Sequence, residues 1–314
     1  MTLRSLLRHE VILAVVLALT LAVLARQSVY FFTLDNLLNQ GRLMAEVSLV
    51  AFAMTFVIVT GGIDLSVGSI LGLTAILLGT LWQNVGLPLA AAILVALLAG
   101  TLAGAINGVI ITRFRVPPLI ATLATLALYR GLAEGISQAR SVRGYPDWFY
   151  VIGQGQTLGV PNQLWIVAVF GVGTAAVLGL TIGGRVTYAI GSNQTAATFS
   201  GLAVNPTKIA IYAFSGFSAA LAAVIFVSRV STTRSDMGTG IELDAITAVV
   251  LGGTSIFGGR GTVIGTVLGL VLMQALKNGV SLAGVTGDGT TVLIGAVLIL
   301  TLLLSNLFRR ESSG

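Results

Sequence analysis

Long apolar runs separated by short polar intervals occupy almost the whole chain. After a first run from Val11 to Ala25, they lie at about 43–60, 67–83, 88–111, 118–137, 164–182, 208–228, 243–258, 262–280 and 290–308. A helix needs roughly 20 residues to cross the ~30 Å hydrocarbon core of a bilayer, and most runs approach that length. The pattern predicts an all-α integral membrane protein with about ten transmembrane helices, a single domain over residues 1–314, and both termini in the cytoplasm.

Two of these runs allow a second interpretation. Arg4 and Arg8 precede the first run, as they would in a signal peptide, but the Ala-Val-Leu-Ala stretch at 22–25 is a poor cleavage site and favours a retained helix. The run at 243–258 is short enough to be a re-entrant segment. The total of ten helices counts it as a span.

Composition agrees with a membrane protein and narrows its chemistry. The chain is 55% hydrophobic and 9% charged, whereas soluble domains carry roughly 25% charged residues. It has no cysteine, which excludes disulfides and thiolate metal sites, and its single histidine, His9, has no ligand partners nearby. The net charge of +6 suits loops facing anionic lipid better than nucleic acid, because no basic face accompanies it.

The interval from Gly183 to Lys208 is the longest clearly polar stretch in the second half of the chain. Ser192 or Asn193 can cap a helix start, and Gly201 stands where a left-handed residue would end that helix. Pro206 then bars its continuation. These signals predict a helix of about two turns, which is either a grip for another protein or an ordinary connector. The basic pairs Arg113/Arg115 and Arg309/Arg310 place this interval on the cytoplasmic side.

Glycines spaced four residues apart recur on three predicted helices. Such spacing puts them on one face and lets backbones approach closely, so static packing is the simplest interpretation. The three sets are Gly68–Gly72, Gly100–Gly104–Gly108 and Gly261–Gly265–Gly269.

The sequence lacks the residues of an enzyme. No phosphate-binding G-x-x-x-x-G-K-[ST] motif occurs, and the carboxylates form no pair with acid/base or metal spacing. We therefore expect no catalytic residue, no metal and no ATP site in this chain. Asp64 is expected to be a boundary charge near a cytoplasmic turn, and Arg130 is expected to pair with Glu134 one helical turn away.

Uncharged polar residues inside the predicted spans suit a path for a small hydroxylated solute, and they equally suit hydrogen bonds between helices. The candidates for the path are Asn107, Thr122, Thr125, Ser218 and Gln274. A self-contained secondary carrier remains the alternative function, although a proton-coupled carrier would need an unpaired carboxylate in mid-membrane.

Four long segments resemble the permease subunits of bacterial ATP-binding cassette importers for sugars, of the ribose, rhamnose and autoinducer-2 branch. They are VTGGIDLSVGSILGL (59–73), INGVIITRFRVPPLIATLATL (106–126), GRVTYAIGSNQTAATFSGL (184–202) and ELDAITAVVLGGTSIFGGRGTVIGT (242–266). They occur in the family's order and extend the likeness over about residues 10–308.

The resemblance implies an importer permease fold in the bacterial inner membrane. It implies a second permease subunit, identical or related, and ATP-binding subunits that hold the ATP and Mg²⁺. It also implies a periplasmic or lipid-anchored substrate-binding protein, and a sugar or sugar-like solute. The family's coupling segment falls on 184–201, and the positions that match it are Gly184, Arg185, Ala189, Ile190, Gly191, Asn193, Ala196, Ala197 and Gly201.

The two largest loops on the predicted outer side are 138–163 and 229–242. We expect their arginines to attract an acidic surface of the substrate-binding protein. These residues are Arg140, Arg143, Arg229 and Arg234.

Overall fold

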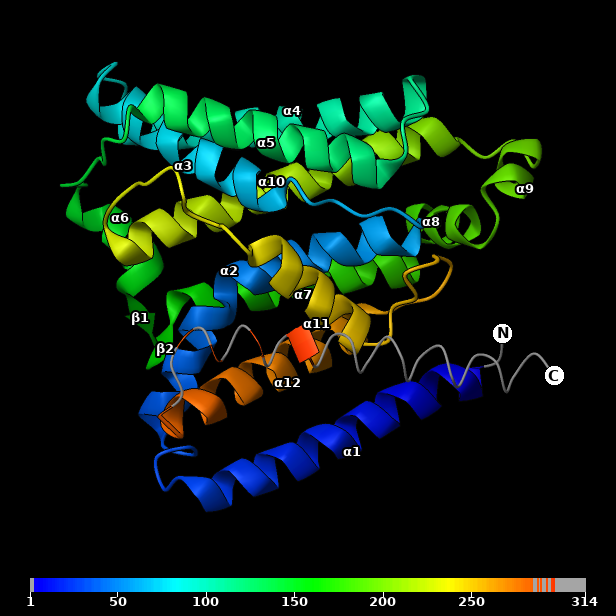
Figure 1. Ribbon diagram of the computed structural model, residues 1–314, viewed down its shortest axis with the longest axis horizontal. Coiled ribbons are helices and arrows are strands. Elements are labelled where there is room, and N and C mark those ends of the chain that lie inside the picture. The colour runs from blue at the N-terminus through cyan, green and yellow to red at the C-terminus, as the bar shows by residue number, and fades with distance from the viewer. Residues whose placement is uncertain (1–2, 285–286, 288, 290–291, 293–294, 297–314) are drawn as a thin grey trace.

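The computed structural model describes residues 3–284, 287, 289, 292, 295 and 296. Within them the chain is mainly helical, with one short hairpin as its named strands (Figure 1). The helices are α1 (Leu3–Gln27), α2 (Leu34–Val59), α3 (Val67–Gln83), α4 (Leu89–Arg113), α5 (Pro118–Ser137), α6 (Asp147–Gln154), α7 (Asn162–Leu180), α8 (Ile182–Ser192), α9 (Gln194–Phe199), α10 (Val204–Val230), α11 (Ile241–Leu251) and α12 (Val263–Leu282). Strands β1 (Gln156–Thr157) and β2 (Val160–Pro161) form a small antiparallel hairpin, in which Gln156 pairs with Pro161.

Six described helices are long and apolar enough to cross a membrane, namely α2, α4, α5, α7, α10 and α12. Two shorter apolar helices, Leu13–Arg26 within α1 and Val67–Gln83, accompany them. The chain is therefore a helical, multi-pass membrane protein. Most of the run predicted at 290–308 lies outside the described residues.

The two ends of the helix bundle differ in the elements that they carry. One end, which we call the α9 end, gathers the α4–α5 turn, α8, α9 and the segment 252–262. The other, which we call the α6 end, carries α6, the hairpin and the outer part of the segment 231–240 (Figure 1). The turns predicted to share one side of the membrane thus lie together at the α9 end.

Glycines bring α4 and α10 into backbone contact. A Cβ at Gly104 would overlap the Tyr212 carbonyl oxygen, and one at Gly216 would overlap the carbonyl oxygen of Gly100. Residues 100–108 therefore serve static packing inside the chain, as predicted. The central α2 is also deeply buried, and its core side chains include Leu49, Met54 and Ile58.

Two helices begin inside the bundle and not at its ends. The extended segment 60–66 runs inward from the α9 end before α3 starts, and the segment 231–240 runs inward from the α6 end before α11 starts (Figure 1). Helix α11 has 11 residues, so at ~1.5 Å per residue it is far too short to cross ~30 Å. Counting 243–258 as a span was wrong, and the re-entrant interpretation fits the structure.

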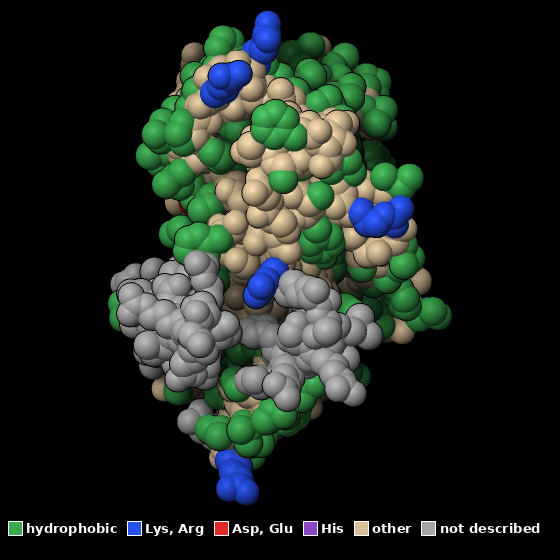
Figure 2. Space-filling view, turned by 90° about the vertical axis from the view of Figure 1, so that its right-hand side faces the viewer, with side chains coloured by type: hydrophobic (Ala, Val, Ile, Leu, Met, Phe, Trp, Pro, Cys, Tyr) green, Lys and Arg blue, Asp and Glu red, His purple; other side chains and the backbone are tan. Residues whose placement is uncertain are grey.

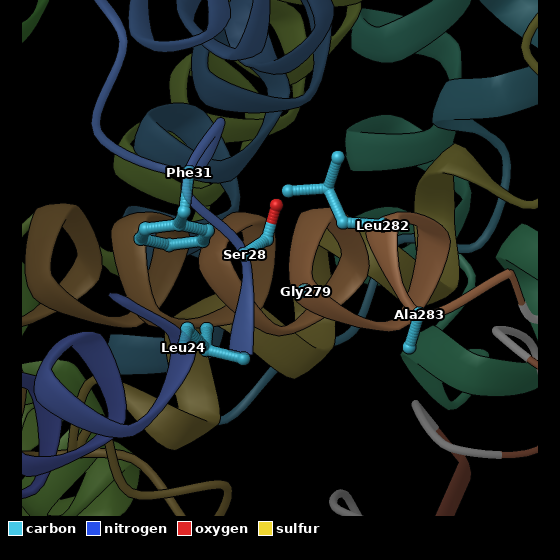
Figure 3. A pocket seen from close by; sticks show the side chains of 6 residues that line it. All are labelled: Leu24, Ser28, Phe31, Gly279, Leu282 and Ala283. Carbon is cyan, nitrogen blue, oxygen red and sulfur yellow. The ribbon is translucent and has the colours of Figure 1, made fainter. Parts of the chain in front are cut away.

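Helix α1 packs against α12 at one side of the bundle. The contact depends on Gly279, where a Cβ would overlap the Leu24 side chain. A shallow pocket beside this contact is lined mainly by apolar groups, with Ser28 as its polar exception (Figure 3).

Candidate coupling site at the α9 end

A single asparagine separates α8 from α9. Asn193 is extended, with φ −162° and ψ 100°, and it ends α8 while it caps α9. Its Oδ1 accepts a hydrogen bond of 2.9 Å from the Ala196 amide, and its own amide donates to the Ala189 carbonyl oxygen at 3.1 Å. Of the two predicted caps, Asn193 is therefore the one used. The sharp turn that it makes projects α9 away from the bundle (Figure 1).

The end of α9 also follows the sequence signals, with one difference. Gly201 adopts the left-handed conformation, φ +76°, directly after the C-cap Ser200. The helix has six residues, so it is shorter than the two turns predicted. Pro206 does not end it, because Pro206 lies in the first turn of α10, where a missing N–H removes no helical bond.

A small apolar core of its own holds the α8–α9 segment together. Ile190, Ala197 and Val204 are buried against one another, and Val186 and Leu202 pack beside them. Lys208 Nζ donates to Gln194 Oε1 at 2.6 Å, which ties α10 to the start of α9. The two helices and the start of α10 therefore form a compact unit.

This unit meets two other segments through glycine backbones. A Cβ at Gly191 would overlap the Val59 carbonyl oxygen, and the same oxygen accepts a 2.8 Å hydrogen bond from the Gly259 amide. A Cβ at Gly258 would lie 2.9 Å from both the Gly191 carbonyl oxygen and the Gly61 nitrogen. We call this meeting of residues 59–62, 191–192 and 257–261 the glycine joint.

Tyr188 adds a side-chain contact to the glycine joint. Its hydroxyl donates a 2.6 Å hydrogen bond to the Gly261 carbonyl oxygen. Burial, with the Glu10 carboxylate nearby as a lesser cause, raises the pKa of the Tyr188 phenol, so it remains a donor at neutral pH. The nearby Thr262 hydroxyl in turn donates to Glu10 Oε1 at 2.6 Å. The N-terminal helix thus reaches the same region.

The outer surface of α9 is exposed and carries an aromatic residue that the sequence reasoning missed. Phe199 is 88% exposed, whereas Ala197 is the buried residue of this helix. An aromatic side chain in an otherwise small and polar helix was the available signal. Around it, the surface at the α9 end shows scattered basic side chains (Figure 2), and Arg113, Arg115, Arg185 and Arg260 are exposed.

Eight of the nine positions predicted for the coupling segment are buried, make a backbone or capping contact, or adopt a required backbone conformation. The ninth, Arg185, is exposed beside them. Gly184 is a further case, since a Cβ there would overlap the Leu178 carbonyl oxygen while its amide donates to the Thr181 hydroxyl at 3.2 Å.

The residues proposed for a solute path all make hydrogen bonds inside the chain. Asn107 Nδ2 donates to Ser66 Oγ at 2.8 Å, and Thr122 Oγ1 to the Ile63 carbonyl oxygen at 3.2 Å. Thr125 and Ser218 donate to carbonyls of their own helices, and Gln274 donates to Gln40 Oε1 at 2.6 Å. Asn107, Thr122 and Gln274 therefore bond other segments of the chain, as in the alternative interpretation, whereas Thr125 and Ser218 bond only their own helices.

The predicted docking arginines divide into two kinds. Arg140 and Arg143 are exposed at the α6 end, and Arg234 is exposed beside Asp236, with 2.9 Å between Nε and Oδ1. Arg229 is different, because its Nε lies 2.8 Å from Oε1 of the buried Glu46 and its guanidinium stacks on Phe226. Its charge is already balanced inside the chain.

The sequence suggested that Arg130 pairs with Glu134, but Arg130 makes other contacts in the structure. Its guanidinium donates to the carbonyl oxygens of Ser235, Met237 and Gly68. It thereby holds the inward segment 231–240 against the start of α3. Gly68 and Gly72 leave the room for this segment, since a Cβ at Gly72 would lie 2.7 Å from Arg130 Nη1.

Comparison with known proteins agrees with a transport function. The family described as "Branched-chain amino acid transport system / permease component" matches residues 33–302. The ribose import permease protein RbsC of Haemophilus influenzae is 38% identical over 93% of this chain and 91% of its own length, and that of Escherichia coli is 39% identical over 93% and 92%. The autoinducer 2 import system permease protein LsrD of Escherichia coli is 40% identical over 82% of this chain and 79% of its own.

No solved structure matches the chain. The family match covers most of its length, and it includes α8, α9 and every segment of the glycine joint. The chain therefore belongs to this family of transport permeases.

Proposed function

We propose that this chain is the membrane-spanning subunit of an importer driven by separate ATP-binding subunits, and that α9 is the element they push. The observation that carries the proposal is the shape of the α9 end. A short helix with an exposed aromatic residue projects from the bundle, and its base is fixed to α2 and to the segment 252–262 by the glycine joint.

The glycine joint gives this push a physical route. Backbone atoms in contact have no rotamers to change, so a displacement of α8 must move Val59 and Gly259 or break their contacts with it. Val59 ends α2 and precedes the inward segment 60–66, while Gly259 lies between α11 and α12. Motion at α9 thus reaches both helices that begin inside the bundle, which suits a transport cycle between two arrangements.

The proposed solute, membrane side and partners are supported by the named relatives and by the positions of exposed arginines. Relatives named for ribose and autoinducer 2 support a sugar or sugar-like solute. The exposed arginines of the α9 end favour a cytoplasmic position for it, in the bacterial inner membrane. The partners would be ATP-binding subunits that hold ATP and Mg²⁺, a second permease subunit, identical or related, and a substrate-binding protein at the α6 end.

Replacement of Phe199 by alanine tests the proposed contact. Phe199 is 88% exposed, so its loss should leave the chain's own thermal unfolding unchanged. Aromatic residues at the centre of an interface are worth ~2 kcal/mol or more, so the dissociation constant of the ATP-binding subunits should rise about thirty-fold. Phe114→Ala is the matched control, since Phe114 is 70% exposed at the same end and lies on the α4–α5 turn.

Equal affinity of the Phe199 variant and the wild type would contradict the proposal. A self-contained secondary carrier, the alternative function, predicts uphill uptake by this chain alone in liposomes under an ion gradient. Our proposal predicts none without the ATPase.

Docking of the substrate-binding protein requires a separate test. We expect Arg140 and Arg143, which are exposed at the α6 end, to speed association with an acidic partner. Their joint replacement by glutamine should lower the association rate and flatten its dependence on salt. An unchanged rate and salt dependence would remove these arginines from the proposal.

A further inference from the structure

Asp64 is a fully buried carboxylate inside the bundle, not a charge at the boundary of the membrane. Its side chain has no exposed surface, and it lies in the segment 60–66, before the start of α3. Oδ1 accepts hydrogen bonds from the Ser66 amide at 3.0 Å and from the Ser66 hydroxyl at 2.6 Å. Oδ2 is 2.8 Å from the hydroxyl of Ser215, which lies near the middle of α10.

The groups that bond Asp64 or interact with it electrostatically are neutral. Ser66 and Ser215 donate to its carboxylate, Asn107 bonds Ser66, and Tyr129 of α5 and Tyr212 of α10 lie close enough for its charge to act on them. The two tyrosines are the titratable members of this set, and as phenols they carry no positive charge. Among the described residues no lysine or arginine forms an ion pair with Asp64.

Hydrogen bonds from neutral donors offset only part of the cost of removing a carboxylate from water. An isolated buried charge is so unfavourable that proteins neutralise it by a proton, a counter-charge or a bound cation. The N-terminus of α3 adds a fraction of a positive charge and no more. The geometry therefore leaves about one unit of negative charge to be balanced.

Two oxygen atoms next to Asp64 have no hydrogen-bond partner. Asn107 is fully buried and bonds Ser66 through its Nδ2, which leaves its Oδ1 unsatisfied. Tyr212 is 1% exposed, and its unsatisfied hydroxyl lies 2.6 Å from where a Cβ of Gly62 would be. The carboxylate is thus surrounded by hydroxyl and amide oxygens, the hard ligands that small cations prefer.

We propose that Asp64 is a binding site for one monovalent hard cation, a proton or a sodium ion, which neutralises it inside the bundle. A bound proton would lie on Oδ2 and be donated to the Ser215 hydroxyl. A sodium ion would draw its oxygen ligands from Asp64, Ser215 and the unsatisfied oxygens of Asn107 and Tyr212.

The position of the site suggests when the cation would be released. Asp64 lies two residues beyond the part of the glycine joint at 59–62, so movement of α8 would pull directly on its segment. This consequence rests on the proposed function, whereas the site itself does not. Its test therefore needs no ATPase.

The experiment measures the thermal unfolding midpoint of the purified full-length chain in detergent. It is recorded against pH in sodium-free buffer and against NaCl, with N-methylglucamine chloride keeping the ionic strength constant. If the cation is a proton, the wild type loses stability as pH rises and NaCl has no effect. If it is sodium, NaCl restores the stability lost at high pH. In both cases Asp64→Asn abolishes the response, because an amide needs no cation.

Glu134→Gln is the matched control, since it removes one carboxylate from the exposed face of α5 and should leave both responses as in the wild type. Ser215→Ala provides a second measurement should Asp64→Asn fail to fold. It removes one donor to the ionised carboxylate, so the pH at which stability is lost should rise by about one unit. In the sodium case, about tenfold more NaCl should be needed, because the same change removes a ligand. Responses shared by the wild type, Asp64→Asn and Ser215→Ala would overturn the proposal.

Discussion

The two ends of the bundle are held together in different ways. At the α9 end, three segments meet through glycine backbones, and a Cβ at Gly191 would overlap the Val59 carbonyl oxygen. The α6 end has a contact of this kind too, since a Cβ at Gly153 would overlap the Arg229 amide nitrogen, but several side chains also reach between elements there. Arg229 pairs with Glu46 at 2.8 Å, Gln154 Nε2 donates to Ser231 Oγ at 2.8 Å, and the Thr233 hydroxyl accepts from the Val142 amide at 3.0 Å.

This difference affects how easily the contacts at each end can rearrange. Side chains can change rotamers and exchange partners, so contacts of this kind are able to open and close. A backbone contact between glycines cannot adjust in that way, and it either moves as a unit or breaks. We therefore expect the α9 end to transmit displacement, and we expect the side-chain contacts of the α6 end to be the ones that rearrange.

Gly191→Ala should have the largest effect of the variants that test this difference, because it breaks the backbone contact between α8 and Val59. The new methyl group would force α8 away from Val59, and overpacking of this kind costs about 1–3 kcal/mol. We expect the thermal midpoint to fall and, in the assembled complex, ATP hydrolysis to persist while uptake is lost. Uptake and ATPase activity measured on the same proteoliposomes check this.

Gly183→Ala is the control within the same helix. A Cβ there would lie 3.5 Å from Thr181 Oγ1, an ordinary contact, so the substitution should stabilise the chain by about 0.5 kcal/mol. If both variants kept uptake tightly linked to hydrolysis, a stiff glycine joint would not be needed for transmission.

Arg229→Met should have the next largest effect, and it acts at the opposite end. It leaves the carboxylate of Glu46, whose side chain is 4% exposed, without its partner. Breaking a buried pair costs about 3–5 kcal/mol, and the 22% exposure of Arg229 brings the expected loss of unfolding free energy to about 2 kcal/mol. Denaturant unfolding compares it with Arg143→Met, an exposed control that should change little. Equal losses in the two variants would show that the Glu46 contact is no more than a surface pair.

The sequence predicted the local features of both ends better than their contacts. The Asn193 cap and the left-handed Gly201 depend on neighbouring residues, so the printed order of residues was enough to find them. Asp64 was misplaced because its environment is built by Ser215, 151 positions away. Arg130 was misassigned for the same reason, since Glu134 is near in sequence while its true acceptors lie on 68 and 235–237.

Asn193→Ala should have a smaller effect that again falls on the α9 end. It removes the side-chain cap of α9, a loss of about 1 kcal/mol confined to the helix that projects from the bundle. We expect the thermal midpoint of the whole chain to move little, while amide hydrogen exchange in residues 194–199 becomes faster. Asn193→Asp keeps an oxygen acceptor and should preserve the protection. Unchanged exchange in the alanine variant would mean that packing of Ala197 alone orders the helix.

Arg234→Gln should have the smallest effect, and it distinguishes a structural from a docking role at the α6 end. Arg234 and its partner Asp236 have side chains 64% and 60% exposed, and exposed ion pairs are worth about 0–1 kcal/mol because water screens them. The unfolding free energy should therefore stay within about 0.5 kcal/mol of the wild type. The association rate of an acidic binding protein should nonetheless fall at low salt, because long-range attraction depends on net charge and not on this pair. A loss of stability without a change in rate would give Arg234 a structural role at this end, like that of Arg229. Arg140 and Arg143 would then be the docking charges.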